Sequence, residues 1–138
     1  MLRTTLTVLL FPLLLQACAT RKGVTSKPLD AGVKAVYAAP FDKVKKAVFD
    51  SLAEMTFGVK EDKWDGRSEN CYLIVASQGL SSGTLGRYCR VVIEKGDAEQ
   101  TVYVIMESKV VGKDAETFDE SLAKDFHAHV GARITKNP

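Results

Sequence analysis

Histidine, the side chain most often found in catalytic and metal sites, is nearly missing from this sequence. His127 and His129 are its only histidines. On a helix, residues two apart project in directions about 200° apart, so this pair cannot hold one metal ion together. A zinc site without further histidine or cysteine partners is improbable. We therefore expect no metal site and no cofactor.

Motifs for nucleophilic or phosphate chemistry are also missing. Ser81 and Ser82 are not surrounded by a nucleophile elbow, and no strained strand-to-helix turn is predicted near them. The glycine-rich stretch 77–86 lacks the Gly-Lys-Ser/Thr ending of a phosphate-binding loop, and it leads toward an expected strand instead of a helix. We expect a protein that is not an enzyme.

The chain has no strong excess of charge of either sign. Its formal net charge is +2, with 46% hydrophobic and 26% charged residues. This balance is typical of a globular domain and gives no reason to expect a nucleic-acid partner. The length of 138 residues suits one domain of ordinary size after removal of any leader.

Only one long apolar run is present, at the N-terminus. Residues 6–15 follow a start with one positive charge, Arg3, and precede small residues around Cys18. A membrane-spanning helix needs ~20 apolar residues, so this shorter run favours a secretory signal. We expect residues 1–17 to be removed on export.

The residues around the expected cleavage site resemble the lipobox of bacterial lipoproteins. Leu15-Gln16-Ala17-Cys18 places an aliphatic residue three positions before the cysteine and a small residue next to it. The resemblance implies a diacylglycerol on Cys18 that attaches the protein to a membrane. Ala19, in place of Asp, favours the periplasmic face of the outer membrane. An ordinary signal peptide with an incidental cysteine is the alternative.

The polar residues 18–32 show no hydrophobic period, and we expect them to form a flexible tether. Residues 33–138 are expected to form one α+β domain. In it, about five antiparallel strands carry two helices on one face, in the order β-α-β-β-β-β-α. The expected elements are strands at 33–38, 57–64, 69–77, 88–95 and 101–111, and helices at 40–56 and from Asp114 to about residue 136.

Two cysteines remain once Cys18 is lipidated, and they face an oxidising compartment. A hairpin loop centred near Leu80 puts Cys71 and Cys89 at equal distances from its tip. In a symmetric antiparallel pair they lie opposite each other, so we expect a disulfide between them. Two buried free cysteines are the alternative.

One loop and the strand after it form a candidate contact surface. Leu80 and Leu85 lie in the glycine-rich loop, and Tyr88 lies between Arg87 and Arg90. Functional contacts are often carried by loops, and a tyrosine beside arginines suits a binding surface.

Parts of the chain resemble uncharacterised envelope lipoproteins of the DUF3568 type. The resemblance is carried by residues 37–52, 57–60, 90–95 and 101–104, and it covers roughly 33 to 134. It implies a fold similar to the helix-grip domains of an accessory lipoprotein in outer-membrane barrel assembly, and it brings no catalytic residues. The cysteine pair and the glycine-rich loop have no place in that pattern.

Together these features predict a non-catalytic accessory or interaction module in the cell envelope, with an envelope protein as its partner. The alternative is a binding module for a small apolar ligand or lipid, held between the sheet and a helix.

Overall fold

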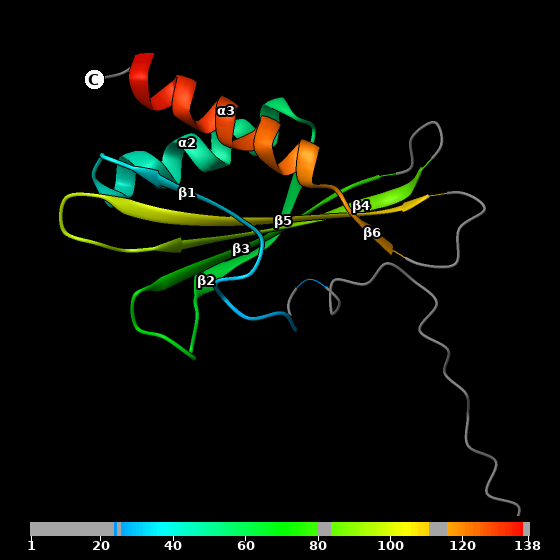
Figure 1. Cartoon of the computed structure of the whole chain (residues 1–138), viewed down its shortest axis with the longest axis horizontal. Helices are drawn as coiled ribbons and strands as arrows, with labels where there is room; N and C mark the ends of the chain where they lie inside the picture. The colour runs from blue at the N-terminus through cyan, green and yellow to red at the C-terminus, as the bar shows by residue number, and fades with distance from the viewer. Residues whose placement is uncertain (1–23, 25, 80–83, 111–115, 137–138) are drawn as a thin grey trace, which may run out of the picture.

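The computed structural model describes residues 24, 26–79, 84–110 and 116–136, which form an antiparallel sheet with two helices on one face (Figure 1). In chain order the elements are β1 (Val33–Tyr37), α2 (Phe41–Glu54), β2 (Gly58–Trp64), β3 (Cys71–Gln78), β4 (Thr84–Glu94), β5 (Gln100–Val110), β6 (Glu116–Phe118) and α3 (Glu120–Lys136). This confirms the predicted two-layer α+β fold and its element order. The short strand β6 is an addition.

The sheet has the strand order β1-β5-β4-β3-β2, and β6 also pairs with β5. β1 and β2 are therefore the two edges of the main sheet. The interior strand β3, next to the edge strand β2, is apolar at six consecutive positions, and all six side chains are buried. Such a continuous run is expected only where both faces of a strand are covered.

The helices cover one face of the sheet. α2 buries a stripe of residues spaced three and four apart, which is the pattern that predicted this helix from the sequence. α3 buries Ala123, Phe126 and Val130 against α2 and the same face of the sheet. Buried side chains from both helices and from β3, β4 and β5 form one continuous core in the space between the layers.

The second face of the sheet is covered by residues 24 and 26–32, which we call the strap. Val24 is fully buried, and Leu29 and Ala31 pack beside it. These three side chains cover an apolar set on β3, β4 and β5: Cys71, Leu73, Val75, Val92 and Ile105. The packed chain thus begins well before residue 33.

The start of the last helix differs from the prediction. Asp114 lies outside the described residues, and residues 116–118 pair with β5 as a strand. α3 begins at Glu120, where the Asp119 carboxylate accepts a hydrogen bond of 2.9 Å from the Leu122 N–H. Asp119 is therefore the helix cap. Phe118, which falls within the predicted helix, lies in β6 and is exposed.

No helix in the described part of the chain is long and apolar enough to cross a bilayer.

Candidate functional site

The predicted disulfide between Cys71 and Cys89 is absent, and both cysteines are buried and free. In the β3–β4 pair, Cys71 lies opposite Glu94 and Cys89 lies opposite Ala76. The hairpin is therefore centred between residues 82 and 83 and not at Leu80. Because side chains alternate between faces, this odd offset puts Cys71 under the strap and Cys89 against the helices. Burial raises the pKa of the Cys89 thiol.

The residues expected to form one contact surface lie on opposite faces of the sheet. Arg87 is on the helix face, where its guanidinium donates to the Gln78 Oε1 at 2.8 Å and to the Ser108 Oγ at 3.2 Å. Tyr88 and Arg90 are on the strap face. Leu80 and the side chain of Leu85 lie outside what the structure describes. These residues do not form a single surface.

Arg90 is the largest fully buried side chain, so its expected place on an exposed surface is wrong. Its guanidinium donates two hydrogen bonds of 2.6 Å, to the carbonyl oxygens of Lys27 and Pro28. Its Nε has no partner among the described residues. Desolvation lowers the pKa of Arg90, while the carboxylates of Asp65, Asp30 and Glu107 act in the opposite direction. Arg90 therefore fastens the strap to the sheet.

A second polar contact holds the same segment. The Lys27 ammonium lies 3.0 Å from the carboxylate of Glu107, whose side chain is 6% exposed. Neither contact is predictable from the strap residues alone, because they show no hydrophobic period. The sequence signal for these contacts lies in β4 and β5. There the charged residues Arg90 and Glu107 stand at positions that face the interior of otherwise apolar strands, which indicates polar partners.

His127 is held in place by two partners on β1. Its Nε2 lies 2.8 Å from the Val33 carbonyl oxygen, and its Nδ1 lies 2.6 Å from the Tyr37 hydroxyl. Since a carbonyl only accepts, Nε2 carries the proton and Nδ1 accepts from Tyr37. Burial lowers the pKa of His127 and raises that of Tyr37. This histidine ties α3 to β1.

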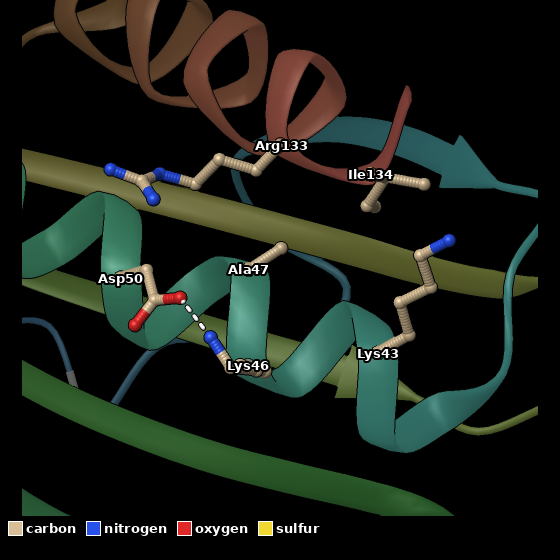
Figure 2. Close-up of a pocket in the computed structure, with 6 residues that line it drawn as sticks. All are labelled: Lys43, Lys46, Ala47, Asp50, Arg133 and Ile134. Atoms are coloured by element: carbon tan, nitrogen blue, oxygen red, sulfur yellow. Dashed lines mark hydrogen bonds and ion pairs between the residues drawn. The ribbon is translucent and has the colours of Figure 1, made fainter. Parts of the chain in front are cut away.

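A groove runs between the two helices on the outer side of the molecule, with a volume of about 290 Å³ (Figure 2). Lys43, Lys46 and Asp50 line it from α2, and Arg133 and Ile134 line it from α3. Lys46 and Asp50 form an ion pair of 2.7 Å, and the hydrogen bond from Lys46 lowers the pKa of Asp50. Because Arg133 is paired with the carboxylate of Glu54, the excess of positive charge in the groove comes from Lys43.

The groove continues toward the C-terminal end of α2. There the Arg133 guanidinium donates to the Glu54 carboxylate, and this hydrogen bond lowers the pKa of Glu54. His129 lies 3.6 Å from the other oxygen of the same carboxylate. His127 and His129 thus have separate environments, and the described residues hold no cluster of three metal-ligating side chains.

An aromatic cluster lies where the start of α2 meets the β2–β3 hairpin. Phe41 stacks on Trp64 with ring centroids 5.2 Å apart, and Tyr72 meets both rings edge to face. Trp64, the only tryptophan of the chain, is 47% exposed. The Lys45 ammonium lies 4.2 Å from the centre of the Tyr72 ring, and that of Lys95 lies 5.6 Å from the centre of Phe41.

Tyr72 also hydrogen-bonds through its hydroxyl to the Asp62 carboxylate. Desolvation, supported by this bond, raises the pKa of Tyr72 to about 12. The hydroxyl is therefore protonated at any physiological pH, and it acts as a donor that fixes the ring.

Each of these contacts holds a backbone segment, a helix or an aromatic ring in place. None of them brings a nucleophile together with a base. Comparison with protein-family models and with curated proteins finds no match. The resemblance to envelope lipoproteins therefore rests on the residues quoted for it in the sequence.

Proposed function

We propose that the protein is a non-catalytic lipoprotein of the outer membrane, anchored through Cys18, whose periplasmic domain acts as an accessory module for an envelope protein. The observation that carries the proposal is the position of the strap. The packed chain reaches back to Val24, so only residues 19–23 separate it from the expected lipidation site. A domain held this close to its anchor is suited to act on partners at the membrane surface.

The contacts made by three ionisable groups support a non-catalytic role. His127 is engaged on both ring nitrogens, Arg90 is bound to strap carbonyls, and the Cys89 thiol is buried among apolar side chains. A general base or nucleophile needs access to a substrate and a pKa near the working pH. These three groups instead stabilise the fold.

The groove between α2 and α3 is the part of the described surface that best suits a protein partner. It is open, concave and lined by charged side chains that project from two rigid helices. Charged groups at the rim of an interface contribute specificity and orientation more than affinity. An acidic segment of a partner would meet Lys43 without having to break the Lys46–Asp50 pair or the Arg133–Glu54 pair.

Metabolic labelling of cells with a fatty acid tests the anchor. The wild-type chain should incorporate the label and fractionate with outer membranes, whereas a Cys18→Ser variant should lose both properties. Incorporation of label by the Cys18→Ser variant would contradict lipidation at this residue.

Photo-cross-linking from the groove tests the partner. A photoreactive residue at Lys43 should capture a defined envelope protein in intact cells, and a Lys43→Glu/Arg133→Glu variant should weaken that capture. A photoreactive residue at Lys34, on strand β1, is the matched control. Equal capture from both positions would show that the groove is not the docking surface.

The alternative of an apolar ligand between sheet and helices has less support. The space between the two layers is filled by fully or nearly fully buried side chains of the core. Native mass spectrometry of the unlipidated domain remains the direct test, because a retained ligand would appear as an added mass.

A further inference from the structure

The face of the sheet that the strap covers, which we call the strap face, exposes two large apolar side chains. Val36 on β1 is 48% exposed, and Phe118 on β6 is 41% exposed. Tyr37 packs against α3, so Val36, next to it in the strand, points to the strap face. Phe118 lies opposite Glu107, whose carboxylate contacts Lys27 of the strap, so Phe118 points to the same face.

The strap lies between these two exposed side chains. Their partners on β5, Thr101 and Glu107, are on either side of Ile105, which the strap covers. Six residues of a strand span about 20 Å, so the two side chains are too far apart to cover each other. Phe118 borders the strap directly. It lines a pocket of about 240 Å³ together with Lys27, Ala31, Gly32 and Ile105.

Tyrosines and lysines surround the exposed apolar groups on the strap face. Tyr88 and Tyr103 are half-buried beside the strap, and Lys34 lies opposite Tyr103. Side chains with an apolar body and a polar end favour the boundary between water and lipid. Lys27 and Lys63 are each paired with a glutamate. Contact with a bilayer should therefore depend on apolar burial more than on anionic headgroups.

The length of the chain before the strap restricts which side of the domain faces a lipid anchor. Val24 is fully buried against the strap face, on the side of the sheet opposite the helices (Figure 1). Six Cα–Cα steps from Cys18 to Val24 span about 20 Å when fully extended. A domain of about 110 residues is roughly 35 Å across, so the path halfway around it is roughly 55 Å. An anchor at Cys18 therefore keeps the strap face next to the bilayer.

We propose that the strap face is the surface with which the domain contacts the bilayer, and that Val36 and Phe118 enter the headgroup region on either side of the strap. This inference rests on the proposed lipid anchor at Cys18. The lipid holds the domain at the membrane, and the burial of side chains otherwise exposed to water fixes its orientation. The groove between α2 and α3 then faces away from the membrane, where an envelope partner can reach it.

Chemical coupling supplies an anchor at the expected position without relying on lipidation in the cell. The mature chain, which begins at Cys18, reacts with a maleimide phospholipid in vesicles of phosphatidylcholine, which carry no net charge. Cys71 and Cys89 are buried, which directs the reaction to Cys18, and a Cys18→Ser chain that stays unattached verifies this. A Trp64→Phe substitution removes the only natural tryptophan.

Single tryptophans then report which side of the domain meets the lipid. Val36→Trp and Phe118→Trp place one on the strap face, and Ala128→Trp places one at an exposed position of α3 as the matched control. A phospholipid with a nitroxide on its headgroup quenches tryptophans at the membrane surface. We expect loss of fluorescence and a shift of emission to shorter wavelength for Val36→Trp and Phe118→Trp, and neither change for Ala128→Trp.

Three results would overturn the proposal: no quenching at any position, equal quenching at all three, or the strongest quenching at Ala128→Trp. Circular dichroism of each variant verifies the fold. Because the anchor is attached chemically, failure of this test leaves lipidation at Cys18 untouched, and failure of the fatty-acid labelling leaves the quenching result untouched.

Discussion

Arg90 is a charged side chain held out of water on an otherwise apolar face of the sheet. Its two hydrogen bonds go to the backbone carbonyls of Lys27 and Pro28 in the strap, and the Pro28 carbonyl also accepts from the Ala31 N–H at 3.1 Å. Removing one member of a buried charged contact leaves its partners unsatisfied, and this usually costs more than the contact itself contributes. The side chain therefore matters mainly through the strap that it holds.

We expect Arg90→Ala to lower the free energy of unfolding by about 3 kcal/mol, because the strap loses both guanidinium hydrogen bonds and a cavity opens. Urea denaturation followed by circular dichroism measures the change. Lys46→Ala is the control, since it removes an exposed cation of an i,i+4 pair and should leave the midpoint nearly unchanged. Equal midpoints for Arg90→Ala and the wild type would show that Arg90 does not fasten the strap.

The free energy of unfolding is expected to depend on pH through His127. Its pKa is lowered from 6.5 in the folded state, mainly by burial, so the unfolded chain binds more protons than the folded one between the two pKa values. Stability is therefore complete above about pH 6.5 and decreases as the pH falls toward the folded-state pKa. Denaturation between pH 7.5 and 5.5 should show this decrease.

A His127→Gln variant should flatten that dependence, whereas His129→Gln should retain it. His129 lies on the exposed side of α3 beside Glu54 and is the matched control. The same slope in the His127→Gln variant as in the wild type would assign the dependence to other groups.

Among the elements, those with a strong period could be predicted and those without one could not. The stripe that begins at Phe41 and Val44 predicted α2 to within a few residues, because a helix with one apolar face has few other ways to bury it. The strand predicted at 69–77 is β3, and its apolar residues are covered on both faces of the sheet. The strap has no period, and its place is fixed by Arg90 and Glu107, which lie more than sixty residues away in the chain.

The β3–β4 register was wrong for a related reason. The sequence indicates a loop at 78–86 but does not fix the residue at its centre. In an antiparallel pair, the numbers of two opposite residues add up to a constant. Moving the centre of the hairpin from Leu80 to between residues 82 and 83 changes this constant from even to odd, and the two cysteines then lie on opposite faces of the sheet. The candidate contact surface failed in the same way, because Arg87 and Arg90 differ by an odd number of positions.

This register predicts that the mature protein carries two free thiols. Alkylation in denaturant without prior reduction should add two labels, at Cys71 and Cys89, and alkylation of the native protein should be slow because both are buried. Mass spectrometry counts the labels. The absence of label in denaturant would show that the cysteines are bridged and that the hairpin has another register.

Gly32 joins the strap to β1 and has a φ of +104°. A Cβ at this position would lie 2.3 Å from the Val104 carbonyl oxygen, and that oxygen belongs to the backbone of β5 and cannot move aside. We expect Gly32→Ala to destabilise the fold by about 2–3 kcal/mol in urea denaturation. Gly66→Ala, where no atom lies within 4 Å of the added methyl, should have little effect. Similar losses for the two variants would contradict the close approach.

For the whole molecule, the strap decides where the domain begins. A two-layer fold of a sheet with helices on one side leaves the other face open to water unless it is polar or covered. Here that face carries Leu73, Val75, Val92 and Ile105, and the strap covers them. The segment next to the expected lipid anchor is thus also part of the hydrophobic core.

Truncation at two points separates the role of the strap from the role of the residues that precede it. A chain that begins at Val24 should be monomeric, because every strap contact is retained. A chain that begins at Val33 should expose the apolar face, bind a hydrophobic dye and self-associate, since contiguous exposed apolar patches promote association. Size-exclusion chromatography with light scattering compares the two. If both chains are equally monomeric, the strap is dispensable. The segment between Cys18 and the packed domain would then be longer, and the proposal that the domain is held close to its anchor would lose its basis.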